Sequence, residues 1–217
     1  MKIISKENLM ELIKYNLKLG IKKDILIENS AQKVIKNIDL ERRDTFSIIA
    51  GTGITGAIGL CIARNLISYD KIVYIYIINT QKNNSEEYIN QLKILKNINI
   101  NINYLDTIEE LSNFPKNLEK SNTIIDAITG IDYDSDFVST FEYIIMNINK
   151  SRIYTISVDI PSGLDYDKGK QKIEAVDPDL IITFHAFKEA LNVNTRLCKT
   201  KIVIENIGLL EKKHVRY

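Results

Sequence analysis

The chain has 217 residues, of which 45% are hydrophobic and 26% charged, a composition typical of a folded globular protein. A formal net charge of +1 gives no field that attracts nucleic acid or an anionic membrane, and no apolar run approaches the length of a spanning helix. Cys61 and Cys198 are the only cysteines, which favours buried free thiols in the cytoplasm over a disulfide framework. We therefore expect one domain over residues 1–217, with no nucleic-acid or membrane partner.

Two helices are expected at the start of the chain. Ser5 can cap the first helix, whose apolar residues recur at helical spacing until Gly20 ends it. The second helix is expected from Asp24 to Ile38, with its apolar residues on one stripe.

The pattern then changes to short apolar runs separated by helical stretches. The runs are rich in Ile and Val and lack polar alternation, which is typical of strands covered on both faces. Strands are expected at residues 46–50, 71–78, 123–125, 153–158, 180–184 and 201–204. Helices are expected between them at residues 57–68, 85–96 and 137–149, whereas the Asn- and Ile-rich residues 97–103 are attributed to compositional bias. This alternation predicts a doubly wound α/β fold with a mostly parallel sheet and helices on both faces.

The ends of the expected strands carry polar or small residues. In parallel α/β sheets, ligands bind outside the carboxyl ends of the strands, so this edge is the predicted site. The residues found there are Gly51, Asn79, Asp126, Asp159 and His185. We interpret His185 as a packed structural histidine.

Residues 51–56, Gly-Thr-Gly-Ile-Thr-Gly, fit the pattern of a glycine-rich phosphate-binding turn between a strand and a helix. Glycines at such a turn also serve tight packing alone, so both interpretations stand. An ordinary dinucleotide-binding fold carries an acidic residue at the end of its second strand. Asn79 stands at that place, which disfavours a standard NAD dehydrogenase.

Two aspartates are the candidate chemical groups. Asp126 ends one strand, and Asp159 begins Asp-Ile-Pro-Ser-Gly, a rigid turn that can hold Asp159 and Ser162 towards one point. The alternative is that each aspartate only caps its turn. Together they could act on a substrate hydroxyl or flank a cation, since Thr55, Asp126 and Ser162 are oxygen donors at one edge. Lys188 is either a ligand for a phosphate or a solvated lysine.

Five segments in chain order carry a family pattern: residues 26–31, 50–64, 125–130, 158–165 and 182–188. The strongest is the fourth, Val-Asp-Ile-Pro-Ser-Gly-Leu-Asp. These segments resemble the YjeF N-terminal domain family of NAD(P)H-hydrate epimerases, whose relatives include apolipoprotein A-I-binding protein. The resemblance spreads over nearly the whole chain.

The resemblance implies a Rossmann-like fold, often homodimeric, that interconverts the R and S forms of hydrated NADH and NADPH (NADHX and NADPHX) and binds a potassium ion. By position, Asp159 would be catalytic and contact the hydrated nicotinamide, while Thr55, Asp126 and Ser162 would bind potassium. Residues 54–58 and 130–136 would line the nucleotide. The substrate-binding residues expected from these motifs are Gly51, Gly53, Ile54, Thr55, Gly56, Ala57, Ile58, Gly130, Ile131, Asp132 and Lys188.

The Gly-rich turn departs from the family's usual Gly-Pro-Gly-Asn-Asn-Gly-Gly-Asp-Gly. Thr52, Ile54, Thr55, Ala57 and Ile58 are the replacements. Thr55 still offers an oxygen, whereas the two isoleucines cannot make the hydrogen bonds of the residues they replace. Two functions therefore stand: an active epimerase, and a catalytically impaired nucleotide-binding or scaffold module on the same fold.

Overall fold

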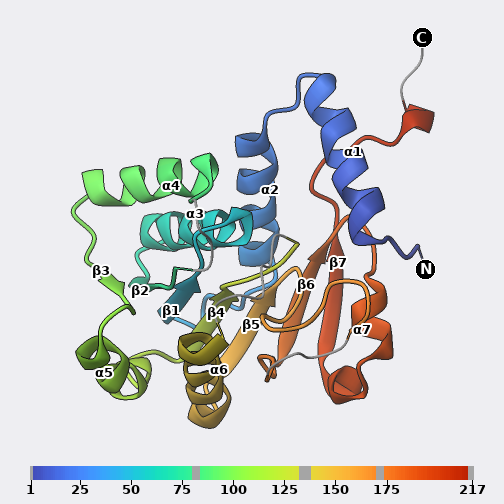
Figure 1. Cartoon of the computed structure of the whole chain (residues 1–217). Helices are drawn as coiled ribbons and strands as arrows, with labels where there is room; N and C mark the ends of the chain where they lie inside the picture. Colours follow the sequence, from blue (N-terminus) through green and yellow to red (C-terminus); the bar gives the residue numbers. More distant parts are fainter. Residues whose placement is uncertain (1, 80–83, 132–137, 170–173, 215–217) are drawn as a thin grey trace.

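A computed structural model of the chain describes residues 2–79, 84–131, 138–169 and 174–214 (Figure 1). Within these ranges lies a seven-stranded, parallel sheet in the order β3-β2-β1-β4-β5-β6-β7. The strands are β1 Thr45–Ala50, β2 Ile72–Ile77, β3 Ile102–Tyr104, β4 Thr123–Ala127, β5 Tyr154–Val158, β6 Leu180–Phe184 and β7 Lys201–Glu205. The order reverses between β1 and β4, which confirms the doubly wound, Rossmann-like fold.

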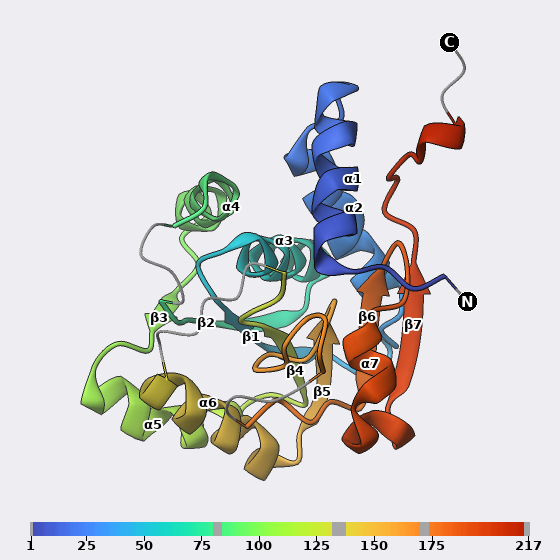
Figure 2. The same ribbon diagram turned by 45° about the vertical axis from the view of Figure 1, so that its right-hand side comes forward.

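Helices cover both faces of the sheet. In Figure 2, α2, α3 and α4 lie on one face, α5, α6 and α7 lie on the other, and α1 lies beside α2. The helices are α1 Lys6–Lys18, α2 Lys23–Lys36, α3 Ile54–Ser68, α4 Glu86–Asn97, α5 Ile108–Leu118, α6 Val138–Ser151 and α7 Glu189–Val193. The two expected N-terminal helices are therefore present. Throughout the described ranges, no helix is long and apolar enough to cross a membrane.

The core is deepest around α3, which packs against the centre of the sheet. Its side chains are buried along nearly its whole length, which explains why its sequence has no polar face. A Cβ atom on Gly59 would lie 2.6 Å from the Cβ of Ala127, so only glycine lets α3 approach β4 this closely. This close contact fixes the start of α3 relative to the end of β4.

The first residues of the chain are tied to segments near its other end. The amide of Ile4 donates to the carbonyl of Phe187 at 2.9 Å, and the amide of Phe187 donates to the carbonyl of Lys2 at 3.0 Å. At the start of α1, the amide of Lys6 donates to the carboxylate of Asp167 at 2.8 Å. The N-terminal end of α1 is therefore held by two segments that are distant in the sequence.

Two neighbouring elements, β3 and α5, have no counterpart among the expected strands and helices. β3 is only three residues long, Ile-Asn-Tyr, and lies partly in the segment attributed to compositional bias. α5 begins with a capping box formed by Thr107 and Glu110, but Pro115 lies inside it, and proline usually ends a helix. The short helix α7 was likewise not expected.

One expectation about the cysteines is wrong. Cys61 is buried in α3, but Cys198 is exposed in the 3-10 helix Thr195–Lys199. Its neighbour Leu197 is buried instead, because consecutive residues of a helix point in different directions. Both cysteines are free thiols.

Candidate functional site

Three loops meet at the carboxyl edge of the sheet. The Gly-rich turn follows β1, the loop with Gly130 follows β4, and the turn that starts at Asp159 follows β5. β1 and β4 are the two strands between which the strand order reverses. Open α/β sheets bind ligands at this topological switch point, so the expected site residues lie where the fold favours a site.

The Gly-rich turn has no room for a side chain at Gly56, and the loop after β4 has none at Gly130. A Cβ atom on Gly56 would lie 1.8 Å from the carbonyl oxygen of Gly51, and one on Gly130 would lie 2.2 Å from Thr55 Oγ1. The amide of Gly51 donates to the carbonyl of Ala127 at 3.1 Å, which fastens the turn to the end of β4. The turn and the β4 loop are therefore packed directly against each other.

The turn leads into the N-terminus of α3. Gly53 is the N-cap residue and contributes no side-chain capping bond. Thr52 Oγ1 contacts Asn79 Oδ1 at 3.5 Å, so the residue that replaces the acid of a dehydrogenase lies against the turn. The backbone N–H groups of a helix N-terminus favour anions such as phosphate.

Asp126 is 1% exposed and lies in a network of neutral donors. Ser157 Oγ donates to its Oδ2 at 2.7 Å, and the amide of Ser162 donates to the same oxygen at 3.0 Å. The hydroxyl of Ser162 donates to Oδ1 and accepts from the amide of Thr129 at 2.9 Å. The carboxylate thus joins β4, β5 and the turn after β5 into one unit.

The charge of Asp126 has no cationic partner in the described part of the chain. Burial raises the pKa of its carboxyl group, and the hydrogen bonds from Ser162 and Ser157 only oppose this effect. A cation beside the carboxylate would offset the cost of burying its charge. The oxygen atoms of Thr55, Asp126 and Ser162 are of the type that hard cations prefer, so these residues fit a potassium ion chemically.

Asp159 lies in a different network, at the end of β5. Its backbone has φ +68°, in the left-handed region that aspartate tolerates better than most residues. Lys188 Nζ lies 2.7 Å from its Oδ1, which also accepts from Thr183 Oγ1 at 3.0 Å and from the amide of Phe184 at 3.2 Å. Tyr166 donates its hydroxyl to Oδ2 at 3.1 Å.

Lys188 lies behind Asp159 and is fully buried. Its ammonium group also donates to the carbonyl of Phe184 at 2.6 Å. Burial lowers the pKa of Lys188, while the nearby carboxylate of Asp159 opposes this effect. The amino group is therefore engaged with the aspartate, and a contact between Lys188 and a phosphate stays a prediction.

An apolar cavity of about 210 Å³ opens beside Asp159. Its walls come from α1, α2, the first turns of α3 and the segment after β7, and they are built mainly from aliphatic side chains and Phe184. Asp159 is its one carboxylate among the described lining residues, and Lys23 is its one basic group. A carboxylate facing an apolar cavity meets little competition from water for a ligand.

The expected site residues occupy three kinds of place. Those that line the apolar cavity are Ile54, Thr55, Ile58, Ile131 and Asp159. Those that form the loops around it are Gly51, Gly53, Gly56, Ala57 and Gly130. Those engaged in buried hydrogen bonds are Asp126, Ser162 and Lys188. Asp132 lies outside the described residues.

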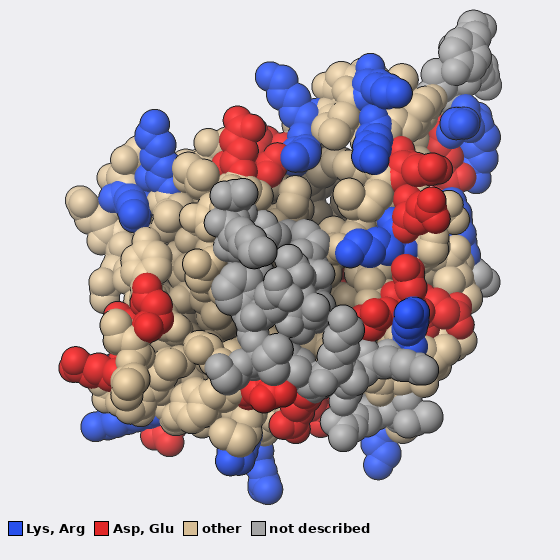
Figure 3. Space-filling view, viewed as in Figure 1, with Lys and Arg blue, Asp and Glu red and all other residues tan. Residues whose placement is uncertain are grey.

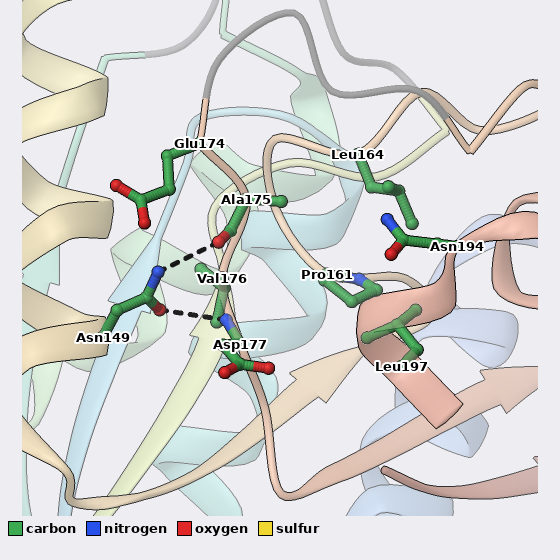
Figure 4. Close-up of a pocket in the computed structure, with 9 residues that line it drawn as sticks. All are labelled: Asn149, Pro161, Leu164, Glu174, Ala175, Val176, Asp177, Asn194 and Leu197. Atoms are coloured by element: carbon green, nitrogen blue, oxygen red, sulfur yellow. Dashed lines mark hydrogen bonds between the residues drawn. The ribbon is translucent and has the colours of Figure 1, made fainter. Parts of the chain in front are cut away.

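A second cavity, of about 420 Å³, lies on the other side of the turn that follows Asp159 (Figure 4). Pro161 and Leu164 form part of its wall. The amide of Asn149 binds Ala175 and Asp177 at 3.0 and 2.9 Å, which holds that wall in place. None of the expected site residues lines this cavity, so the chemistry favours the cavity at Asp159.

Several residues of the two networks were not expected from the sequence. Ser157 pairs laterally with Asp126 in the sheet register, a contact that correct alignment of β4 and β5 would have indicated. Thr183 stands near the end of β6, and correct alignment of β5 and β6 would likewise have indicated its contact with Asp159. The sequence gives no comparable indication for Tyr166, because only a turn of the chain brings its side chain back to Asp159. His185 is of intermediate burial, but its side chain is only 7% exposed and its Nε2 lies 3.7 Å from Glu211 Oε1, in keeping with a packed histidine.

Comparison with known proteins agrees with this geometry. The family described as YjeF-related protein N-terminus matches residues 23–190. A relative from Anaerococcus prevotii, named NAD(P)H-hydrate epimerase, is 42% identical over 187 residues, which cover 86% of this chain and 85% of that protein.

A longer relative and a solved structure extend the comparison. The bifunctional NAD(P)H-hydrate repair enzyme Nnr of Methanocaldococcus jannaschii is 32% identical over 204 residues, which cover 88% of this chain but 37% of that protein. The crystal structure of yeast ynu0, YNL200c, superimposes with a TM-score of 0.76 at 24% identity and covers 94% of this chain and 88% of that chain. The yeast structure shows that the fold is shared.

Proposed function

The chain belongs to the YjeF-related N-terminal family, and we propose that it is an NAD(P)H-hydrate epimerase, an isomerase that interconverts the R and S forms of NADHX and NADPHX. The relative from Anaerococcus prevotii carries this name and aligns over 86% of the chain. The structural observation that carries the proposal is Asp159, a buried carboxylate that is paired with Lys188 and faces an apolar cavity.

Epimerisation inverts the C6 carbon of the hydrated nicotinamide, which bears a hydroxyl group and is bonded to the ring nitrogen. Either the C–O or the C–N bond must open and form again, and both routes move a proton at that hydroxyl group. Asp159 is the carboxylate that can exchange this proton, since it lines the cavity. The ammonium group of Lys188 balances its charge.

We further propose that the N-terminus of α3 and the loop at Gly130 bind the nucleotide, and that Thr55, Asp126 and Ser162 hold a potassium ion. The N–H groups at the start of a helix suit phosphates. The buried charge of Asp126, which neutral donors surround, supports a cation nearby. When bound, the ion supplies positive charge beside the anionic ligand.

The proposal is tested by incubating R-enriched NADHX with the protein in potassium buffer and following the ratio of epimers by chromatography. We expect the approach to equilibrium to be faster than the spontaneous rate. Asp159→Asn should abolish most of the acceleration, whereas Asp177→Asn, an exposed carboxylate on the other side of the turn, should not. A wild-type rate equal to the spontaneous rate would contradict the proposal.

A second candidate, a nucleotide-binding or scaffold module without activity, rests on one observation. Ile54 and Ile58 line the cavity and offer it no side-chain hydrogen bonds. If this candidate is correct, NAD(P) nucleotides or their hydrates raise the melting temperature without being epimerised, or have no effect on it at all. The two assays together separate an enzyme, a binding module and a scaffold.

The remaining partners stay predictions. On the face seen in Figure 3, basic and acidic side chains are interspersed outside the grey atoms, so that face offers no continuous basic surface to nucleic acid. A homodimer is expected, and analytical ultracentrifugation tests it. A cytoplasmic location is also expected, and cell fractionation tests it.

A further inference from the structure

Tyr166 lies against the carboxylate to which the proposed function assigns the chemistry. We propose that Tyr166 is a positioning residue for the epimerase reaction: its hydroxyl group holds the Oδ2 oxygen of Asp159 in the direction from which that oxygen meets the substrate. This inference rests on the proposed function. It gives a role to a residue that none of the recognised sequence motifs required.

The two oxygen atoms of Asp159 have different surroundings. Oδ1 accepts from Lys188 Nζ at 2.7 Å, Thr183 Oγ1 at 3.0 Å and the amide of Phe184 at 3.2 Å. A carboxylate oxygen has about two good acceptor positions, so three donors leave Oδ1 no room for a substrate hydroxyl. Oδ2 accepts from Tyr166 at 3.1 Å, and the described residues supply it with no other donor. Oδ2 is therefore the oxygen that can bind the substrate.

The position of Tyr166 is set by the turn that carries it. The amides of Asp167 and Lys168 donate to the Asp165 carboxylate at 3.1 and 2.7 Å, and the amide of Gly169 donates to the Asp165 carbonyl at 3.1 Å. These bonds close a tight turn directly around Tyr166. The backbone that carries the phenol group is therefore held without any contribution from Asp159.

The turn is also anchored from outside. The amide of Lys6 donates to the carboxylate of Asp167 at 2.8 Å, which joins the turn to the start of α1. A Cβ atom on Gly169 would lie 2.4 Å from Val193 Cγ2, so the turn packs closely against α7 as well. Because α1 and α7 both hold this turn, the hydroxyl group of Tyr166 can fix the orientation of the Asp159 carboxylate.

The ring of Tyr166 has a second contact in the same network. Lys188 Nζ lies 6.0 Å from the ring centroid, at the outer limit of a cation–π contact. Tyr166 is 5% exposed, and its ring helps to keep water from the ion pair. A phenylalanine would keep this packing and lose only the hydroxyl group, so Tyr166→Phe separates the packing of the ring from its hydrogen bond.

The test measures kcat and KM of wild type, Tyr166→Phe and Tyr88→Phe with R-enriched NADHX. Tyr88 is a matched control because it is 1% exposed in α4, away from the two aspartate networks. We expect Tyr166→Phe to lower kcat at least about tenfold with KM within about twofold, since one hydrogen bond to a charged group is lost. Tyr88→Phe should leave both constants near wild type.

A proton NMR spectrum provides a readout that needs no activity. A buried hydroxyl group that donates to a carboxylate gives a slowly exchanging downfield resonance. It should be present in wild type and in Tyr88→Phe, absent in Tyr166→Phe and shifted in Asp159→Asn. Absence of this resonance in wild type, an unchanged kcat in Tyr166→Phe, or equal losses in both tyrosine variants would overturn the role of Tyr166. Absence of epimerisation by wild type would instead contradict the proposed function.

Discussion

Asp126 and Asp159 stand at the carboxyl ends of the adjacent strands β4 and β5, and both are buried. Asp126 binds serine hydroxyl and backbone amide groups, while Asp159 is paired with the ammonium group of Lys188. The apolar cavity reaches Asp159, whereas Asp126 is not among its described lining residues. The two aspartates share no hydrogen-bond partner among the described residues.

This difference separates two tasks that the sheet places side by side on adjacent strands. A buried carboxylate bound by neutral donors from three segments fastens loops together and leaves a charge that a metal cation can balance. A carboxylate that is already paired with a lysine and borders a cavity is prepared to exchange a proton with a ligand. The neighbours of each aspartate, rather than its place at a strand end, therefore decide its role.

The largest expected effect is on the epimerisation rate. Asp159→Asn should lower kcat about 10²- to 10⁴-fold, because the amide cannot exchange the proton. Asp126→Asn should lower it less, because Asp126 acts on the loops and the proposed cation. Initial rates per folded molecule, with folding checked by circular dichroism, make the comparison. Equal losses of kcat in the two variants would contradict the assignment of proton exchange to Asp159 and of loop and cation binding to Asp126.

The next effect concerns the stability of the Asp159 region. Lys188→Met should lower the free energy of unfolding by about 3–5 kcal/mol, because it leaves a buried carboxylate unpaired. The double variant with Asp159→Asn should recover part of this loss, as measured by urea denaturation. Arg42→Met is a control, since Arg42 forms an exposed pair with Asp39 that should be worth less than about 1 kcal/mol. Additive losses in the double variant would argue against a coupled ion pair.

Potassium should also distinguish the Asp126 network from the Asp159 network, by a smaller change in the free energy of unfolding. At about ten times its Kd, an ion that binds only the folded chain stabilises it by about 1.4 kcal/mol, which a thermal melt detects. Choline chloride at equal ionic strength is the control. Asp126→Asn and Thr55→Val should remove the stabilisation, whereas Asp159→Asn should retain it. If only Asp159→Asn removed the stabilisation, the cation would bind at the Asp159 network and not at Asp126.

The smallest effect is expected in alkaline solution. Burial first, and then the charge of Asp159, raise the pKa of Tyr166 well above 10.0. The stability that this tyrosine contributes is therefore complete below pH 10 and is lost as the pH rises towards the pKa of the folded state. The lowered pKa of Lys188 acts in the opposite direction, so wild type is compared with Tyr166→Phe. The variant should lose less stability above pH 10, and parallel pH profiles would contradict this.

The strands and the edge at which the loops meet could be predicted because their signals are local. Apolar runs indicate buried parallel strands, and the segment from Asp159 to Gly163 is compact enough to be recognised in the sequence. β3 escaped prediction because three residues show no periodicity. α5 escaped because Pro115 concealed a helix that its capping box indicated.

The partners of the two aspartates could not be predicted, because they depend on tertiary contacts. The sequence marks Lys188 as a possible phosphate ligand or a solvated lysine, and only the packing of β6 and α7 around it makes it a buried counter-ion. Tyr166 lies seven residues after Asp159 and reaches it through the reversal of the chain at residues 165–169. A single sequence gives the candidate acids but not the groups that control them.

The hydrogen bonds that hold the start of the chain also bear on the order in which the protein assembles. Lys6 is bonded to Asp167, which follows Tyr166, and Phe187, which precedes Lys188, is bonded to Lys2 and Ile4. Ile4 and Lys6 are synthesised before their partners and cannot take their places until Asp167 and Phe187 have followed. We therefore expect this edge of the site to close only after Phe187 has been synthesised, and exchange of the Ile4 and Lys6 amides with deuterium should report when it does.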